Sequence, residues 1–263
     1  MIGWRAEEER EREVPAVLEA VSATAIDLAL ADLEKEKRLP TLDPAARQDP
    51  ESTATLMRSL AWTSRLLGIP VPELYLASDP PHELVAAPAA RPTALVSRAL
   101  GSGLSLPELA FIWGRHLPMY RPEHYLLVFY PTLRDIASLL VAALALGGHE
   151  THESLTGKAA DLSKRLDAAL DAEARQRLTQ AVTDFDARNM RRRIAAWMRS
   201  VRLSGGRAGL LACGDLHLAA KLLERFPPAG GLEAEDELGD LRAYSISREY
   251  AELRERIGVA VPR

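Results

Sequence analysis

The sequence predicts a mostly helical α+β protein with one small sheet, and three observations carry this prediction. Segments with apolar residues at helical spacing fill most of the 263 residues, as in amphipathic helices. Three short extended segments joined by tight turns stand together, at residues 71–76, 82–87 and 93–96. A helix start with Ser105 and Pro107 follows them directly. We therefore expect a small antiparallel sheet packed on a central helix over residues 106–118.

The other helices follow from apolar spacing and from the positions of proline and glycine. Residues 6–37 predict a long amphipathic helix that ends before Pro40, because the residue before a proline avoids the helical region. A helix over residues 52–67 should stop at Gly68. Residues 230–237 are expected to form a loop. The remaining expected helices cover residues 132–146, 158–170, 172–185, 188–204, 206–212, 215–225, 235–243 and 247–256.

Composition places the chain among ordinary globular proteins. Hydrophobic residues make up 47% and charged residues 27%, which excludes a disordered chain. We expect residues 1–70 to form a helical region packed on the core and residues 71–263 to form the main domain, together one compact unit. The formal net charge of −4 argues against a wholly basic nucleic-acid coat protein.

Cysteine content and hydropathy predict the cellular compartment. The single cysteine, Cys213, excludes an intrachain disulfide and favours a reducing cytoplasm. The N-terminal residues are too charged for a signal peptide. The longest apolar run is short of the roughly 20 residues that span a bilayer. A cytoplasmic protein with no membrane partner is the prediction.

Two stretches of the sequence carry motifs of a known enzyme family. Residues 93–100 (TALVSRAL) precede the helix segment 106–113 (LPELAFIW), and residues 207–211 (RAGLL) precede a turn at 213–217. In these features and in the order of its elements, the chain resembles the zinc metallopeptidases typified by the CAAX prenyl proteases and the bacterial heat-shock membrane protease. The resemblance covers roughly residues 52–225. It implies a zincin-like scaffold, in which a helix bearing His-Glu-x-x-His and a Glu on a later helix hold zinc.

Further phrases resemble a divergent branch of that family. Residues 113–117 (WGRHL), 117–126 (LPMYRPEHYL) and 244–258 are similar to metallopeptidase-like domains at the ends of helical-repeat (TPR-type) proteins of myxobacteria and their relatives. That branch generally lacks the zinc signature. The resemblance therefore implies a pseudoenzyme whose partners are proteins, among them helical-repeat proteins or a larger bacterial assembly.

The positions that hold zinc in the resembled family carry unsuitable residues here. Zinc hydrolysis needs three protein ligands and an open position for water. Arginine has no lone pair to offer, methionine suits softer metals, and Pro118 would distort the helix. The resemblance thus implies a non-catalytic binding or scaffolding module without metal or other cofactor. The two histidine positions, the base position, the third-ligand position and the aspartate position are, in that order, Arg115, Met119, His116, Arg202 and Gly206.

Anion binding is one alternative function. Arg115 and Arg202 would face each other across the former metal cleft, where two guanidinium groups repel unless a carboxylate or phosphate lies between them. An internal Glu or a bound anion could serve, or each Arg could reach solvent or pair with a local acid. A stripe on one helix side could also contact nucleic acid or an acidic protein, although a solvated amphipathic helix is the commoner explanation. The stripe comprises Arg188, Arg191, Arg192, Arg199 and Arg202.

A hydrolase with a relocated site is the other alternative. His116 with Glu108, or His124 with Glu123, would supply an acid–base pair, and Cys213 with His217 would supply a thiol and a base. We interpret Cys213 as a small apolar residue, because Gly214 and Asp215 break the helix between the two. The histidines of the segment 149–153 (HETHE) lack helical spacing, so we expect a solvated loop there. His82 and Glu83 are expected to begin a strand, since Ala86 replaces the second histidine of a metal pair.

Overall fold

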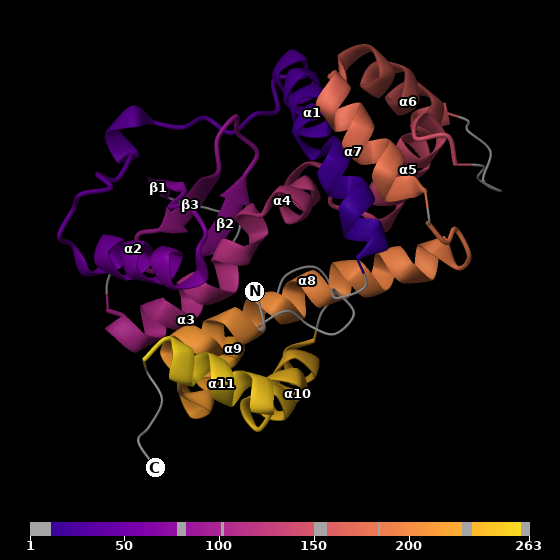
Figure 1. The fold of residues 1–263 in the computed structure, drawn as a ribbon. Helices are drawn as coiled ribbons and strands as arrows, with labels where there is room; N and C mark the ends of the chain where they lie inside the picture. Colours follow the sequence, from indigo (N-terminus) through magenta and orange to yellow (C-terminus); the bar gives the residue numbers. More distant parts are fainter. Residues whose placement is uncertain are drawn as a thin grey trace.

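The computed structural model describes residues 12–77, 83–100, 103–149, 157–183, 185–227 and 233–258. Helix accounts for 68% of it, beside one three-stranded sheet, so the prediction of a mostly helical α+β protein is confirmed. Figure 1 shows the sheet on one side, a group of helices around α1 on the other, and the long helix α8 running beneath both.

The sheet is mixed, and the prediction of an antiparallel sheet is wrong for one of its two pairings. Its strands are β1 (Glu73–Ala77), β2 (Leu84–Ala87) and β3 (Thr93–Ser97), in the order β1-β3-β2. β3 pairs antiparallel with β2 but parallel with β1. Because β3 inserts between the two earlier strands, β1 and β2 are not neighbours, and a turn between them does not make a hairpin.

Two hydrophobic cores lie side by side. The first buries side chains of α1 (Glu13–Lys35), α4 (Pro122–Phe129), α5 (Leu133–Leu146), α6 (Gly157–Ala169), α7 (Ala172–Val182) and the first half of α8 (Met190–Cys213). The second joins the sheet to α2 (Thr55–Leu67), α3 (Leu106–His116), the second half of α8, α9 (Leu216–Arg225) and α10 (Ala234–Ser245), with α11 (Arg248–Arg256) against it. The region before residue 70 thus gives one helix to each core.

Helix α1 is long and apolar enough to cross a membrane, with 23 residues and a mean hydropathy of 1.6. A core helix of a soluble protein passes the same test. Here Val17, Leu18 and Val21 are fully buried in the first core. The absence of a membrane partner stays a prediction.

Several helix boundaries follow the predicted local signals. Ser105 and Glu108 form a capping box at the start of α3, and Gly68 ends α2 in the left-handed conformation that favours glycine. α3 ends at His116, and a 3-10 turn, Leu117–Tyr120, contains Pro118. The helix expected over residues 106–118 is therefore correct except for its last turn.

Three boundaries differ from the predictions. Helix α4 was not among the predicted helices; it begins at Pro122, since proline suits a first helical turn. α8 is continuous, whereas two helices were expected on either side of Gly205. Residues 230–232 of the predicted loop lie outside the described residues, and α10 begins at Ala234 and includes the acidic residues that were expected in that loop.

Candidate functional site

Helices α3 and α8 touch backbone to backbone, and this contact depends on glycine. A Cβ atom added to Gly114 would lie 2.7 Å from the Gly209 Cα, and one added to Gly209 would lie 2.8 Å from the Phe111 carbonyl oxygen. A Cβ on Gly205 would lie 2.6 Å from the Arg115 carbonyl oxygen. These distances are too short for any side chain, so glycine permits the close approach. The glycines expected to break α8 therefore serve its packing.

Arg115 stands at this junction and is fully engaged by the protein. Its Nε and Nη2 donate to the Oε1 and Oε2 of Glu237 at 3.0 and 2.9 Å, and its Nη1 donates to the Phe226 carbonyl oxygen at 2.7 Å. Glu237 is only 1% exposed and Arg115 18%. Burial raises the pKa of Glu237, and the adjacent Arg115 guanidinium opposes that rise. An internal carboxylate thus lies opposite Arg115.

Gly206, on α8, approaches the same carboxylate of Glu237. A Cβ at this position would lie 2.6 Å from the Glu237 Oε1. The structure therefore brings together two of the five residues predicted at the former metal site, Arg115 and Gly206. Sequence reasoning did not identify Glu237, which is 122 residues from Arg115 in the chain.

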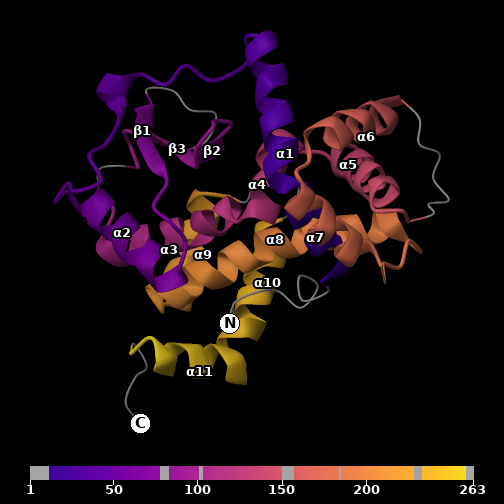
Figure 2. The same cartoon turned by 45° about the horizontal axis from the view of Figure 1, so that its top comes forward.

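Helix α10 carries three acids that each pair with an arginine of α3 or α8. Beside Glu237, Asp236 accepts from Arg199 at 3.2 Å, and Asp240 accepts from the Nε of Arg207 at 2.7 Å. We call Arg115, Arg199, Arg207 and these three acids the arginine junction. The Arg207 guanidinium also lies over the Tyr244 ring, 5.1 Å from its centroid. Figure 2 shows α10 descending from α8, with α11 beyond it.

His116 is held in the neutral form. Its Nε2 lies 2.8 Å from the Tyr120 hydroxyl, which itself donates to the Thr93 carbonyl oxygen at 3.0 Å. The hydroxyl has one proton, so Nε2 carries its own proton and donates it. Burial and the neighbouring Arg115 lower the pKa of His116 to about 3. This imidazole links the end of α3 to the sheet and is a weak base at neutral pH.

The residues predicted at the metal positions of the resembled family do not fit a zinc ion. The Arg115 guanidinium is bound to Glu237, and Met119 lies in the 3-10 turn, where it loses the α-helical i, i+4 relation to Arg115. Arg202 is half-buried, burial lowers its pKa, and its side chain makes no hydrogen bond or ion pair with the residues that the structure describes. Within the described part of the chain, no group of three His, Cys, Asp or Glu residues could hold a metal.

The residues of the predicted arginine stripe do not all lie on α8. Arg188 precedes α8 and pairs with Asp186, whose Oδ2 lies 2.8 Å from the Arg188 Nη2. Arg191 and Arg192 are exposed in the first turn of α8. Arg199 is paired with α10. Arg188 and Arg199 are thus paired with acids of the chain, and Arg191 also has an interaction partner.

The predicted acid–base pairs are either separated or buried. Glu108 caps the first turn of α3, eight residues from His116, which is about 12 Å along a helix. Glu123 and His124 do lie together, with 3.9 Å between Oε1 and Nε2, but they are 3% and 0% exposed. Arg121 pairs with Glu123, and His124 Nδ1 donates to the Pro118 carbonyl oxygen. This group supports the turn into α4.

The remaining candidates have local structural roles where they are described. Burial raises the pKa of Cys213 to about 11, and Gly214 with the Asp215 cap ends α8, as predicted. His217 is exposed beyond that break. The His149 Nε2 lies 2.8 Å from the Phe185 carbonyl oxygen. The remaining residues of these motifs, His82, Glu150, His152 and Glu153, lie outside the described residues.

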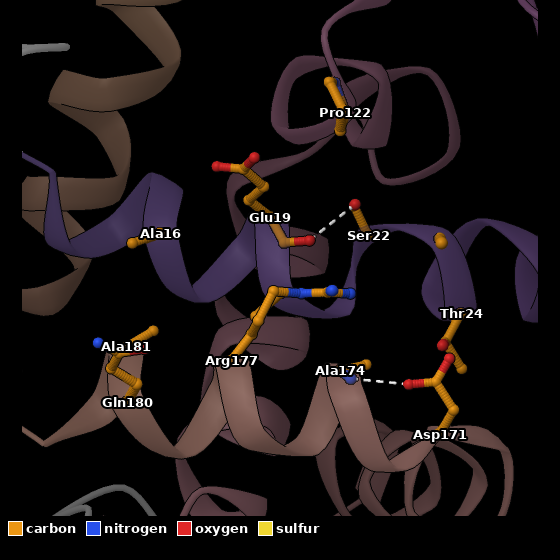
Figure 3. Close-up of a pocket in the computed structure, with 12 residues that line it drawn as sticks. Ala16, Glu19, Ser22, Thr24, Pro122, Asp171, Ala174, Arg177, Gln180 and Ala181 are labelled. Atoms are coloured by element: carbon orange, nitrogen blue, oxygen red, sulfur yellow. Dashed lines mark hydrogen bonds between the residues drawn. The ribbon is translucent and has the colours of Figure 1, made fainter.

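A hollow of about 660 Å³ lies between α1 and α7, and sequence reasoning missed it. Small side chains such as Ala16 and Ala174 line this space between the helices (Figure 3). Its charged groups are engaged locally: Arg177 pairs with Glu173, and Asp171 caps the Ala174 N–H. Nothing in this lining is arranged for a particular ligand.

Comparisons with protein-family models, with curated proteins and with solved structures found no match for this chain.

Proposed function

We propose that this chain is a non-catalytic protein-binding module built on a metallopeptidase-like, zincin-type scaffold. The observation that carries the proposal is the buried pair of Arg115 and Glu237. It occupies the position at which the resembled enzymes hold their metal, and the guanidinium has no capacity to ligate. The chemistry is lost while the packing around it is retained, as expected for a scaffold kept for binding. Cytoplasmic proteins, among them helical-repeat proteins, are the proposed partners.

The free edge of β2 is the proposed place of contact. Ser97 N donates to the Glu83 carbonyl oxygen, so by alternation Val85 and Ala87 bond to β3 while Leu84 and Ala86 turn their backbone groups outward. No described strand pairs with this edge. The opposite edge of the sheet is covered, since Gln48 N donates to the Leu74 carbonyl oxygen. An extended partner segment would add to β2 as a fourth strand.

A proline substitution tests this contact. Extended peptides selected on the full chain from a random display library serve as probes. Ala86→Pro removes one outward N–H without touching the ladder to β3, so the affinity of such peptides should fall at least about tenfold. The control is Ala61→Ser, a change on α2 away from this edge, which should leave the affinity unchanged.

Two outcomes would overturn the proposal. Selected peptides that bind Ala86→Pro as tightly as the wild-type chain would remove the β2 edge as the contact. Zinc-dependent cleavage of a bound peptide by the purified chain would show that the module is an enzyme.

A further inference from the structure

The outer side of α2 differs from its inner side in charge and in burial. Leu56, Leu60 and Leu67 are buried in the second core. Arg58, Trp62 and Arg65 are exposed on the opposite side. Arg58 is four residues before Trp62 and Arg65 three residues after it, so the three side chains are neighbours on the helix surface. We call these three residues the Arg-Trp face.

Trp62 is an unusual residue to leave in water. It is 39% exposed, whereas Trp113 and Trp197 are 0% and 2% exposed. An exposed indole forgoes a large hydrophobic gain, and tryptophan is enriched among residues that anchor protein interfaces. Its exposure therefore marks a candidate contact surface.

The two arginines beside it are available for an incoming anion. The side chains of Arg58 and Arg65 make no hydrogen bond or ion pair with any residue in the described part of the chain, and the sequence of α2 contains no acid. In the arginine junction, by contrast, each arginine has a carboxylate partner. The Arg-Trp face thus has two exposed cations on a chain whose formal net charge is −4.

We propose that the Arg-Trp face binds an acidic protein segment in which one apolar side chain lies between two carboxylates. The indole offers a flat apolar surface, and each guanidinium can take a carboxylate in a bidentate pair. Arg58 and Arg65 are about 10 Å apart along the helix axis. Because side chains alternate in an extended segment, carboxylates four residues apart share one face with the apolar residue midway between them. They lie about 13 Å apart, a spacing that the two long, flexible arginine side chains can reach.

A single-stranded nucleic acid is a less suitable partner for this face. Bases stack on aromatic side chains, and arginines contact phosphates. A phosphate backbone, however, is bound by a long positive groove, and here only two cations flank one indole. This surface is on a different element from the β2 edge, so the inference does not depend on the proposed function.

The test uses the full chain and the peptide fluoresceinyl-Gly-Ser-Glu-Ser-Phe-Ser-Glu-Ser-amide, in which the two Glu residues and Phe share one face of an extended segment, in a fluorescence anisotropy titration. We expect saturable, salt-sensitive binding below about 1 mM. The double variant Arg58→Glu/Arg65→Glu and the variant Trp62→Ala should each weaken binding at least about tenfold. A peptide with Ser in place of Phe should bind about tenfold more weakly.

The control is Arg192→Glu, which reverses an exposed arginine of α8 far from any exposed tryptophan of the described chain and should leave the affinity unchanged. Circular dichroism shows whether each variant is folded. The proposal is overturned if the peptide fails to bind at about 1 mM, or if the α2 variants bind as the wild type does. It is also overturned if a ten-nucleotide oligothymidine binds this face, with loss in the double variant, while the peptide does not.

Discussion

The arginine junction and the Arg-Trp face use the same cation in opposite ways. At the junction, Arg115 and Glu237 are buried together, and two further arginines pair with acids of α10. On α2, Arg58 and Arg65 project into solvent beside an exposed indole. The difference teaches that an arginine cluster indicates a binding surface only where the fold supplies no carboxylate of its own.

The largest effect should come from removing one member of the buried pair. Glu237→Ala leaves the Arg115 guanidinium without its counter-charge, so the free energy of unfolding should fall by about 3–5 kcal/mol. Arg199→Ala removes a pair that is about half exposed and should cost about 0–1 kcal/mol. Urea denaturation measures both values.

A double variant sharpens this prediction. Arg115→Met with Glu237→Leu replaces both charges by apolar groups and should restore most of the stability that Glu237→Ala loses. If Glu237→Ala and Arg199→Ala cost the same small amount, the junction would be no more buried than an ordinary surface pair, and the contrast with α2 would fail.

The next largest effect concerns the glycines that bring α3 and α8 together. Gly209→Ala places a Cβ against the Phe111 carbonyl oxygen, and the strain should lower the free energy of unfolding by about 1–3 kcal/mol. Gly239→Ala, on α10, meets nothing within 4 Å and should raise stability by up to about 1 kcal/mol. Thermal unfolding followed by circular dichroism compares them. Equal shifts in one direction would contradict close packing at the junction.

The pH dependence of stability tests whether His116, next to Arg115, is shielded from solvent. The folded-state pKa of His116 is about 3, below the usual value of about 6.5. Between these two pH values His116 is protonated in the unfolded chain but not in the folded chain. The free energy of unfolding therefore falls as the pH falls, by at most about 1.4 kcal/mol per pH unit.

Substitution at His116 isolates its part of that loss. His116→Gln retains a donor for the Tyr120 hydroxyl and should reduce the loss between pH 6.5 and 5 by on the order of 1 kcal/mol. The control is His217→Gln, the same substitution at an exposed histidine of α9. A profile that His116→Gln does not alter would mean that the imidazole is solvated.

The smallest effect on stability belongs to the Arg-Trp face. Arg58→Glu/Arg65→Glu should change the free energy of unfolding by no more than about 0.5 kcal/mol, because neither side chain has a partner in the described chain. Urea denaturation of the double variant checks this. A loss above about 2 kcal/mol would show that these arginines support the fold and are not reserved for a partner.

Features encoded locally were predictable from the sequence. Ser105 and Glu108 mark the start of α3, Gly68 marks the end of α2, and Gly214 with Asp215 marks the break between α8 and α9. Each of these signals acts through hydrogen bonds or backbone conformations within a few residues. Their outcome therefore does not depend on the rest of the fold.

Features set by distant neighbours were not predictable. Gly205 is compatible with a continuous α8 only because α3 packs against it, and the parallel pairing of β1 with β3 has no local signal. The degenerate metal positions were chosen through the resemblance, which identified Arg115 and Gly206 but not their shared partner. Glu237 comes from a helix near the end of the chain, and no spacing rule connects it to Arg115.

The most direct test of the proposed loss of metal chemistry is the metal content of the purified, untagged chain, measured by elemental mass spectrometry without added chelator. We expect zinc far below one atom per chain, because a guanidinium paired with Glu237 stands where a ligand is needed. About one zinc per chain would contradict the assignment of Arg115, Met119 and Arg202 to the former ligand positions.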